Sequence, residues 1–339
     1  MNVAIIGCGL IGQKRANALE NCCLVACVDQ IREKAEKLAS QFPNCLAFVE
    51  WQEVIKRKEI DIVIVSTVHA ALADITFAAI ETGKHVLVEK PAGCRPHELV
   101  PLIALSQQTG SIVRVGFNHR YHRVFRKARE LIDAGLLGEL MFLRARYGHG
   151  GRIGYEKEWR AQPLLSGGGE LIDQGMHLID LARWFLGDFQ EVQGFANTYY
   201  WDMAVDDNSF LLLKTQTEKI AFLHASCTEW KNIFSFEIYG KKGKIDINGL
   251  GGSYGVERIT FYQMTPAMGP PEAITWEYPM IDDSWQVEFA EFIEDIKIKR
   301  QPSAGLADAQ AALQIVEKIY CLSGYQQPFS HQQERYCGT

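Results

Sequence analysis

A glycine-rich turn near the amino terminus constrains the fold more than any other stretch of the 339-residue chain. The apolar run Val3-Ala4-Ile5-Ile6, typical of a buried strand, leads into Gly7-Cys8-Gly9-Leu10-Ile11-Gly12, and helix-forming residues follow from Gln13 to Glu20. In this G-x-G-x-x-G pattern the first glycine permits a tight turn, the second lets the backbone approach a pyrophosphate, and the third allows close helix–strand packing. The pattern predicts dinucleotide binding at the helix amino terminus, with contacts from Gly7, Gly9, Leu10, Ile11 and Gly12.

A carboxylate follows at the spacing that ribose recognition requires. The apolar run from Leu24 to Val28 predicts a second strand, and it ends at Asp29, 17 residues after Gly12. About 20 residues is typical for the acid that hydrogen-bonds a ribose diol. Asp29 would repel a 2′-phosphate, so we expect NAD in preference to NADP. Arg32 lies near enough to soften that preference and is a further candidate contact.

Strand and helix patterns alternate over residues 1–120, which predicts a doubly wound parallel sheet, the Rossmann arrangement. Further strands are expected at 47–48, 60–65, 86–88 and 112–116, and helices at 31–41, 51–56, 75–81 and 96–109. Ligands of such sheets bind beyond the carboxyl ends of the strands. The candidate cofactor contacts at these ends are Ser66, Thr67, His69, Glu89 and Lys90.

Composition excludes several classes of function. The net charge is −6 and no run of five basic residues occurs, so a nucleic-acid partner is not expected. No apolar stretch reaches the roughly 18 residues of a membrane span. The nine cysteines form no C-x-x-C pair, which favours reduced, mostly buried thiols. The first strand begins at Asn2 and leaves no room for a signal peptide, so we expect a cytoplasmic protein.

The second half of the chain becomes rich in strands. After a helix at 125–134 and a strand at 140–147, strands are expected at 192–196, 209–214, 220–226, 234–239, 244–247 and 258–262. Strands without intervening helices predict a large, mostly antiparallel sheet. Residues 249–284 hold several prolines and glycines and are expected to be irregular, and helices are expected at 285–299 and 308–321. We therefore predict an α/β protein: a Rossmann domain at 1–121 and an α+β domain at 122–339.

A polar loop and a buried helix of this second domain are candidates for ligand binding. The loop offers His149, Arg152, Tyr155, Trp159 and Arg160, which suit a polar, ring-shaped ligand as well as they suit an ordinary surface loop. The helix, expected at 171–186, is apolar nearly all round. Its one polar stripe holds Asp173, with His177 about 40° and Asp180 about −20° away.

Two interpretations of the polar stripe remain open. Asp180 or Asp173 could pair with Arg183 or another base, or the stripe could line a cleft. The spacing D-x-x-x-H-x-x-D could also bind a metal, but no further Cys or His cluster supports one, and no metal is expected.

Several motifs together resemble the Gfo/Idh/MocA oxidoreductases, and the resemblance covers nearly the whole chain. It rests on the glycine turn, Asp29, Gly83-Lys84-His85-Val86-Leu87-Val88-Glu89-Lys90-Pro91 and Gly116-Phe117-Asn118-His119-Arg120-Tyr121. The stretch Gly167-Gly168-Gly169-Glu170 to Asp180 is similar to the second family signature. The family commonly has a Thr-Pro-Asn-type turn where this chain has Thr67-Val68-His69, so the contacts of Thr67 and His69 are less securely implied.

The resemblance implies catalytic roles for Lys90, Asp173 and His177, and often a cis Lys-Pro bond. His177 is the preferred general base because its unperturbed pKa lies near neutrality, and Lys90 would stabilise the developing alkoxide. Lys90 as the base remains an alternative. Asp173 would orient the substrate or His177. Asn118 and Arg120, with the loop residues above, are the expected substrate contacts.

The implied function is an NAD-dependent dehydrogenase that transfers a hydride between a nicotinamide and a hydroxyl or carbonyl of a sugar, polyol or sugar nucleotide. The alternative is a catalytically silent sensor of the same fold that binds a dinucleotide and a sugar. A sensor has no need of Lys90, Asp173 and His177, and their presence favours the enzyme. The family also pairs subunits through the open face of the second sheet, which implies a homodimer or homotetramer.

Overall fold

The computed structural model describes residues 1–267 and 269–325. Within these ranges no helix has both the length and the apolar character needed to cross a bilayer. The chain forms two compact units, which are described separately. Unit 1 contains Met1–Asn118 and Trp285–Leu313, and unit 2 contains His119–Ser284 and, among the described residues, 314–325.

Unit 1 is built on the predicted parallel sheet. Its six strands run in the order β3-β2-β1-β4-β5-β6, and every pair is parallel. The strands are β1 (Asn2–Ile6), β2 (Cys23–Val28), β3 (Leu46–Phe48), β4 (Ile62–Val65), β5 (His85–Val88) and β6 (Val113–Val115). The strand order reverses between β1 and β4, and because these two strands are parallel, their carboxyl ends lie at the same edge of the sheet.

Helices cover both faces of this sheet, as its apolar strands require. All four residues of β4 are buried, which is typical of a strand covered on two sides. The helices of unit 1 are α1 (Leu10–Asn17), α2 (Arg32–Ala39), α3 (Trp51–Ile55), α4 (His69–Glu81), α5 (Pro96–Thr109), α9 (Ser284–Ile298) and the first half of α10 (Leu306–Leu322). Helix α4 begins six residues before the expected start at 75.

Helix α9 differs from the predicted partition because it packs with unit 1. Phe289 and Phe292 lie in the same apolar cluster as the strands β1, β2 and β4. Arg15 of α1, which is fully buried, pairs with Glu288 of α9 and also donates from Nε to Glu89 Oε1 at 2.6 Å. This buried ion cluster joins α9 to the sheet, and neither partner lies near Arg15 in the sequence.

Unit 2 contains the predicted large sheet, with eight strands in the order β14-β13-β12-β11-β7-β10-β9-β8. All pairs are antiparallel except β7 with β10. The strands are β7 (Leu140–Gly148), β8 (Phe189–Asn197), β9 (Asn208–Thr215), β10 (Ile220–Ser226), β11 (Ile233–Gly240), β12 (Gly243–Asn248), β13 (Glu257–Gln263) and β14 (Glu272–Tyr278). Strand β14 lies in the stretch expected to be irregular, and that prediction was wrong for these residues.

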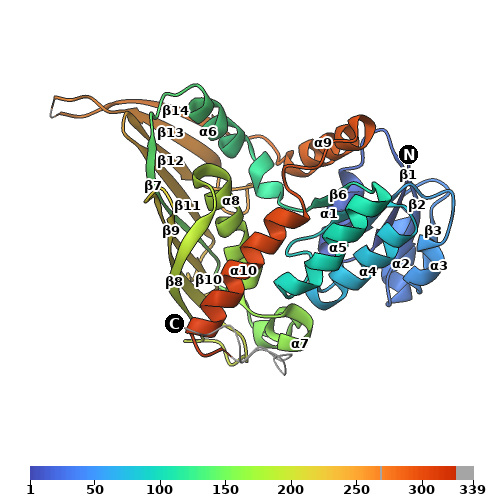
Figure 1. Ribbon diagram of the computed structural model, residues 1–339. Helices are drawn as coiled ribbons and strands as arrows, with labels where there is room; N and C mark the ends of the chain where they lie inside the picture. Colours follow the sequence, from blue (N-terminus) through green and yellow to red (C-terminus); the bar gives the residue numbers. More distant parts are fainter. Residues whose placement is uncertain (268, 326–339) are drawn as a thin grey trace. The chain divides into compact units, whose positions relative to one another are not determined.

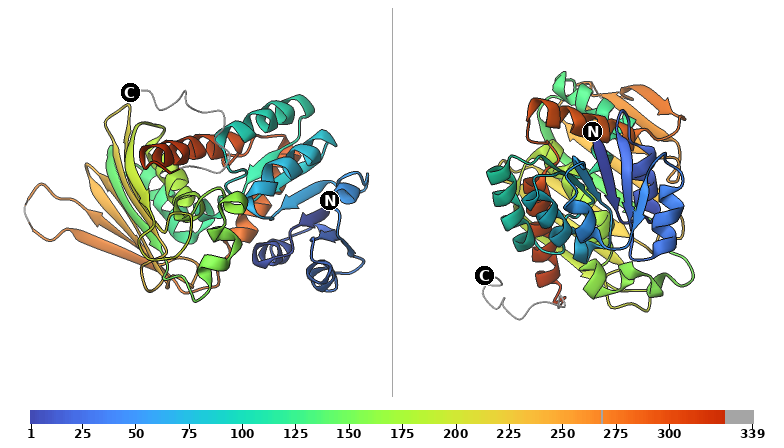
Figure 2. Two further views of the ribbon diagram at one scale, coloured as in Figure 1. Left: turned by 90° about the horizontal axis from the view of Figure 1, so that it is seen from below. Right: turned by 90° about the vertical axis from the view of Figure 1, so that its right-hand side faces the viewer.

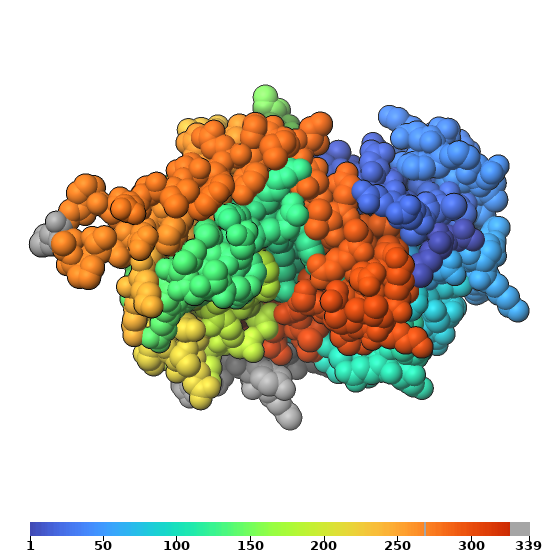
Figure 3. Space-filling model, turned by 90° about the horizontal axis from the view of Figure 1, so that it is seen from above, coloured from blue at the N-terminus to red at the C-terminus, as the bar shows by residue number. Residues whose placement is uncertain are grey.

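Helices cover one face of this sheet and leave the other open (Figures 1 and 2). The helical elements of unit 2 are η1 (Asn118–Tyr121, from His119), α6 (Arg123–Asp133), η2 (Tyr155–Lys157), η3 (Trp159–Ala161), α7 (Pro163–Ser166), η4 (Leu171–Gly175), α8 (Met176–Leu186) and the second half of α10. Burial alternates along β11, as expected for a sheet covered on one side. Figure 3 shows α6 (green) beside β13 and β14 (orange), and Lys127 of α6 lies 4.7 Å from the ring of Trp276.

The helix expected at 171–186 is divided into two parts. Residues Leu171–Gly175 form a π-helical turn, η4, and α8 then continues to Leu186. A π turn inserts one residue into the helical repeat and is often found at functional sites. Asp173 therefore belongs to the wide turn, and His177 and Asp180 belong to the regular helix.

A buried carboxylate holds the start of this turn. Asp206 accepts hydrogen bonds from Gly169 N at 2.8 Å, Leu171 N at 2.8 Å and the hydroxyl of Tyr320 at 2.6 Å. A Cβ atom at Gly169 would lie 1.9 Å from Asp206 O, so the two segments can approach this closely only because residue 169 is glycine. Asp206 thereby fixes the backbone on either side of Glu170.

Removing Arg15 should destabilise the protein strongly, because Glu89 and Glu288 would stay buried without their cation. We expect Arg15→Ala to lower the free energy of unfolding by about 3–5 kcal/mol. The matched control is Arg32→Ala, whose side chain is 63% exposed and pairs with Glu36 on the surface of α2. That variant should change stability by less than about 1 kcal/mol. Urea unfolding of both variants checks this, and equal midpoints would contradict it.

Burial raises the pKa of Asp206 to about 6, whereas an unfolded aspartate titrates near 3.9. Between about pH 4 and pH 6, the folded state therefore holds a proton that the unfolded chain has released. The contribution of this proton to the free energy of unfolding is full below about pH 4 and is lost as the pH rises through 6. Relative to Asp206→Asn, wild-type stability should fall by about 3 kcal/mol between pH 4 and pH 7. Urea unfolding at both pH values measures the difference. The exposed neighbour substitution Asp202→Asn should show no such trend, and a pH-independent offset for Asp206→Asn would refute the assignment.

Candidate active site

The glycine turn of unit 1 has the geometry that a bound pyrophosphate needs. Gly7 has a φ of +99°, and a Cβ atom there would lie 2.4 Å from Ser66 O. A Cβ atom at Gly12 would lie 2.0 Å from Gly7 O, so both positions require glycine. At Gly9, by contrast, no atom lies within 4 Å of the Cβ position. The backbone is therefore open where α1 begins at Leu10, and the free N–H groups of that helix end can bind an anion.

Asp29 is held firmly at the end of β2. Its Oδ2 accepts a hydrogen bond from Cys8 N at 2.9 Å, and its Oδ1 accepts one from Ile31 N at 2.9 Å. These contacts fix the carboxylate beside the glycine turn, as a ribose ligand requires. Arg32 is engaged with Glu36 at 3.5 Å on the exposed side of α2. The residues present in unit 1 thus fit an NAD molecule.

Several other predicted cofactor contacts serve the framework of unit 1. The Ser66 hydroxyl donates to Gly7 O at 2.7 Å, and the Thr67 hydroxyl donates to Val68 O at 3.2 Å. Glu89 is the partner of Arg15 described above. His69 lies buried at the first position of α4. The observed bonds of Ser66 and Glu89 hold the strand ends in place, so these two residues support the dinucleotide site indirectly.

Lys90 lies two residues after the end of β5 at Val88, at the carboxyl edge of the parallel sheet. The peptide bond between Lys90 and Pro91 is cis, which confirms that expectation. The lysine is half-buried, whereas Pro91 and the residues after it are buried. Lys90 therefore occupies the edge of the sheet where ligands of this fold bind.

In unit 2, Arg120 is committed to a buried ion pair. Its Nε lies 2.8 Å from Asp180 Oδ2, and its Nη2 lies 2.5 Å from Asp180 Oδ1. A bidentate pair of this kind fixes both side chains. Arg183, the partner first considered for Asp180, instead contacts Asp188. Asp180 thus pairs with a base, as the first interpretation of the polar stripe expected, but that base is Arg120. Arg120, a predicted substrate contact, is buried in unit 2. Asn118, another predicted substrate contact, is buried at the end of the first segment of unit 1.

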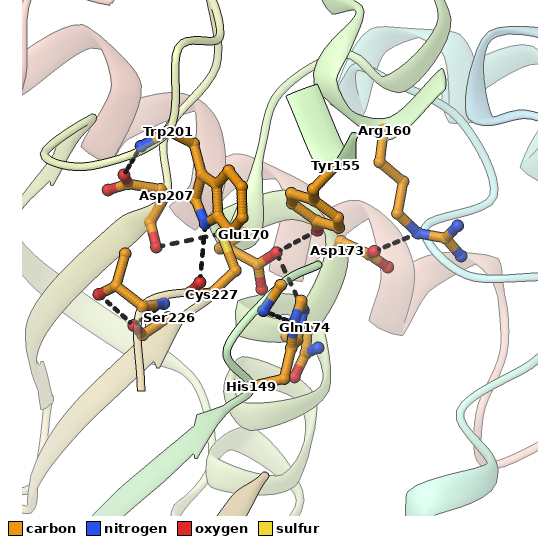
Figure 4. A network of polar contacts seen from close by, with 12 residues as sticks. His149, Tyr155, Arg160, Glu170, Asp173, Gln174, Trp201, Asp207, Ser226 and Cys227 are labelled. Atoms are coloured by element: carbon orange, nitrogen blue, oxygen red, sulfur yellow. Dashed lines mark hydrogen bonds and ion pairs between the residues drawn. The ribbon is translucent and has the colours of Figure 1, made fainter. Parts of the chain in front are cut away.

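The polar loop at 149–160 is organised around a buried carboxylate, Glu170 (Figure 4). The Tyr155 hydroxyl donates to Glu170 Oε1 at 2.7 Å, and His149 Nε2 lies 3.4 Å from the same oxygen. Burial lowers the pKa of His149, but the hydrogen bond and charge of Glu170 outweigh it, so the net pKa is raised. Glu170 Oε2 has no hydrogen-bond partner among the residues that the structure describes.

The carboxyl end of the loop lies against the π turn. Arg160 donates from Nε to Asp173 Oδ2 at 2.8 Å, and its guanidinium lies 4.5 Å from the ring of Trp159. The charge of Asp173 raises the pKa of Arg160. Three predicted residues, Trp159, Arg160 and Asp173, are therefore brought together. Arg152 is not part of this group, because its side chain is 70% exposed and pairs with Glu158.

His177 lies in an aromatic cluster on the covered face of the sheet. Its ring stacks on His119 with centroids 3.7 Å apart, and Tyr147 contacts both rings edge-on or tilted. Tyr254 packs against Tyr147 at 5.0 Å, and its hydroxyl lies 3.5 Å from Gln174 Nε2. His177 and Asp173 are thus surrounded by polar aromatic side chains.

Sequence reasoning missed the residues that support this loop. Glu170 could have been suspected, because a charged residue directly before a buried helix needs partners. Trp201 packs 5.6 Å from Tyr155 and donates to Cys227 O at 2.9 Å. Asp207 accepts from the backbone N–H groups of residues 199, 200 and 201 and so shapes the turn that carries Trp201. The contacts of Trp201 and Asp207 had no signal in the sequence.

Within residues 1–267 and 269–325, one group of side chains brings three metal-ligating atoms close together. It consists of His122, Glu257 and Asp282. His122 Nδ1 lies 2.6 Å from Glu257 Oε1, and Glu257 also accepts from Gly251 N at 3.1 Å. The bonds of Glu257 join the start of α6 to β13 and account for the group without an ion.

The chain is similar in sequence to several characterised dehydrogenases. It is 30% identical over 199 residues to D-glucoside 3-dehydrogenase of Escherichia coli (strain K12), an alignment that covers 55% of this chain and 54% of that protein. The chain thus spans about half the length of this relative. It is 21% identical over 313 residues to inositol 2-dehydrogenase of Salmonella typhimurium (strain LT2), covering 89% of this chain and 88% of that protein.

Solved structures share the fold. A levoglucosan dehydrogenase in complex with NADH and levoglucosan superposes with a TM-score of 0.87 at 21% identity, and the match covers 96% of this chain and 97% of that one. Residues 1–117 match the model of an oxidoreductase family with an NAD-binding Rossmann fold. Residues 125–246 match the GFO/IDH/MocA C-terminal domain. The two matches together cover more than half of the sequence, and the chain belongs to the Gfo/Idh/MocA oxidoreductase family.

Proposed function

We propose that this protein is an NAD-dependent dehydrogenase that acts on a hydroxyl or carbonyl group of a sugar, polyol or sugar nucleotide. The observation that carries the proposal is the glycine turn, which is open at Gly9 and flanked by the fixed carboxylate of Asp29. When bound, NAD supplies the hydride acceptor or donor. Gly7, Gly9 and Gly12 would lie against its pyrophosphate and Asp29 against its ribose.

The chemical roles are assigned from the family motifs. We propose that Lys90 hydrogen-bonds the reacting oxygen and stabilises its developing negative charge. His177 is proposed to accept the hydroxyl proton, with Lys90 as the alternative base. The ion pair with Arg160 gives Asp173 a fixed orientation, which suits a residue that positions the substrate. These roles require neither a metal ion nor ATP.

The substrate class is inferred from the relatives and from the loop. The relatives named above are a glucoside dehydrogenase, an inositol dehydrogenase and a levoglucosan dehydrogenase. The loop presents Trp159 and Arg160 beside Asp173, a combination of an apolar ring face and charged hydrogen-bonding groups. Such a surface is suited to the faces and hydroxyl groups of a sugar ring.

Incubation of the purified protein with NAD and a panel of free sugars, inositols and sugar nucleotides tests the proposal, with NADH fluorescence as the signal. We expect turnover with one class. Lys90→Ala should lower kcat by about 100-fold or more, because a charged group at a developing oxyanion is lost. NADH affinity should stay within about threefold, since the glycine turn and Asp29 are unchanged.

Lys58→Ala is the matched control, because Lys58 is an exposed lysine of the same unit. It should retain wild-type turnover. Tight NADH binding without turnover of any compound would favour the sensor over the enzyme. Failure to bind NADH at all would refute the assignment of the glycine turn.

We also propose that the protein forms a homodimer or homotetramer through the open face of the unit 2 sheet. Apolar side chains gather there on adjacent strands: Phe195 is 63% exposed, Leu212 46% and Phe222 45%. Phe222 lies opposite Leu212 in the β9–β10 pair, and Phe210 lies opposite Phe195 in the β8–β9 pair. A contiguous exposed apolar surface of this kind commonly marks a protein interface.

Phe222→Glu should lower the oligomeric state measured by size-exclusion chromatography with light scattering, because it places a charge in the apolar surface. The control is Leu136→Glu, which adds the same charge to a residue that is 46% exposed in the connection between α6 and β7. The control should keep the wild-type mass. A monomeric wild type, or an unchanged mass for Phe222→Glu, would contradict the proposed interface.

A cytoplasmic location and the lack of a nucleic-acid partner remain predictions from composition.

A further inference from the structure

Two cysteine side chains touch beneath the dinucleotide-binding turn of unit 1. Cys27 Sγ and Cys45 Sγ lie 3.6 Å apart. Seven cysteines are free thiols in the described part of the chain, and Cys27 and Cys45 are two of them. Cys321 is disulfide-bonded, which corrects the expectation of reduced thiols at that position. The dehydrogenase chemistry proposed above makes no use of Cys27 or Cys45.

The two thiols differ in accessibility and in backbone restraint. Cys27 is fully buried in β2, between Ile5 of β1 and Ala47 of β3. Cys45 is half-buried and lies in the turn between α2 and β3, just after Asn44, whose φ is +58°. Its backbone N–H makes only a long bond, 3.4 Å, to Phe42 O. Cys45 can therefore be reached by a small oxidant and can move, whereas Cys27 is fixed.

The thiols also differ in their tendency to ionise. The hydrogen bond between Cys27 and Cys45 lowers the pKa of Cys45. The pKa of Cys27 is raised by its contacts with Cys45 and Cys8 and by burial. The thiolate is the reactive form of cysteine, so Cys45 is the nucleophile of the pair and Cys27 the neutral partner.

The position of the pair connects it to the dinucleotide site. Only Val28 separates Cys27 from Asp29. Asp29 N donates to Phe48 O at 3.2 Å, at the end of the strand that Cys45 precedes. Asp29 in turn holds Cys8 N of the glycine turn at 2.9 Å. A displacement of residues 45–48 would thus be transmitted to the carboxylate that faces the ribose.

We propose that Cys27 and Cys45 are an oxidisable dithiol site, which a peroxide converts to an intramolecular disulfide that weakens dinucleotide binding. The Cys45 thiolate attacks the peroxide and the O–O bond breaks, which gives Cys45 sulfenic acid and an alkoxide or hydroxide. This anion takes up the proton that the Cys45 thiol had released to water, and an alcohol or water forms. Cys27 then attacks the sulfenic sulfur, loses its proton to the departing hydroxide, and water is released. The two sulfur atoms lose two electrons, which the peroxide accepts.

Peptide mapping identifies the bond directly. The reduced full-length protein is treated with equimolar hydrogen peroxide, alkylated and cleaved by trypsin without reductant. Cleavage after Arg15, Arg32, Lys37 and Lys56 separates residues 16–32, which hold Cys22, Cys23 and Cys27, from residues 38–56, which hold Cys45. We expect a cross-linked pair of these peptides that disappears with dithiothreitol.

Variants assign the cross-link to one sulfur atom. Cys27→Ala should abolish it, and Cys23→Ala, which alters an exposed cysteine of the same peptide, should leave it intact. If Cys27→Ala does not fold, Cys22→Ala and Cys23→Ala, which should both keep the cross-link, assign it to Cys27 by elimination. Loss of the cross-link in Cys23→Ala, or its absence from wild type, would overturn the site.

Titration with NADH measures the functional consequence. The dissociation constant of the oxidised wild type should be about fivefold higher or more than that of the reduced protein, and dithiothreitol should restore it. Cys45→Ser should bind NADH equally before and after peroxide. An unchanged NADH affinity in fully cross-linked protein would overturn the link between the dithiol and the dinucleotide site.

Discussion

A buried carboxylate with three hydrogen-bond donors holds together the segment on which the candidate site of unit 2 depends. Asp206 ties Gly169, Leu171 and Tyr320 to one point, and an unpaired charge at such a depth would cost several kcal/mol. The π turn that follows is wide enough to present Asp173 to Arg160, while Glu170 receives Tyr155 and His149. The polar loop is thus ordered by the carboxylates of Glu170 and Asp173, and the segment that carries them is held by Asp206.

In unit 1 the backbone of the glycine turn must stay open to a ligand although the strands and helix around it are closely packed. Glycine at positions 7 and 12 allows strand, turn and helix to approach within distances that a Cβ atom would forbid. Asp29 then closes the turn by accepting two backbone hydrogen bonds. The same carboxylate stands beside the oxidisable thiols, so the stability of the turn and its sensitivity to oxidation have one structural origin.

Much of this organisation could be predicted from local patterns. Both sheets, the glycine turn and nearly every strand follow from alternation, apolar runs and turn residues. Strand β14 was missed because its residues are mostly exposed and it lies in a stretch rich in proline and glycine. The placement of α9 in unit 1 and the pairing of Arg120 with Asp180 were missed because they depend on contacts between distant residues. The sequence identified Asp173 and Arg160 separately, and only the structure shows that they pair.

The central claim is that the protein itself transfers a hydride between a sugar or polyol and NAD. The most direct measurement follows deuterium from carbon-deuterated glucose, myo-inositol and their nucleotide-linked relatives into the nicotinamide ring by NMR. Our account predicts deuterium at C4 of the reduced nicotinamide with at least one of these compounds and none without the protein. Saturating binding of NADH with no deuterium transfer from any compound would contradict it.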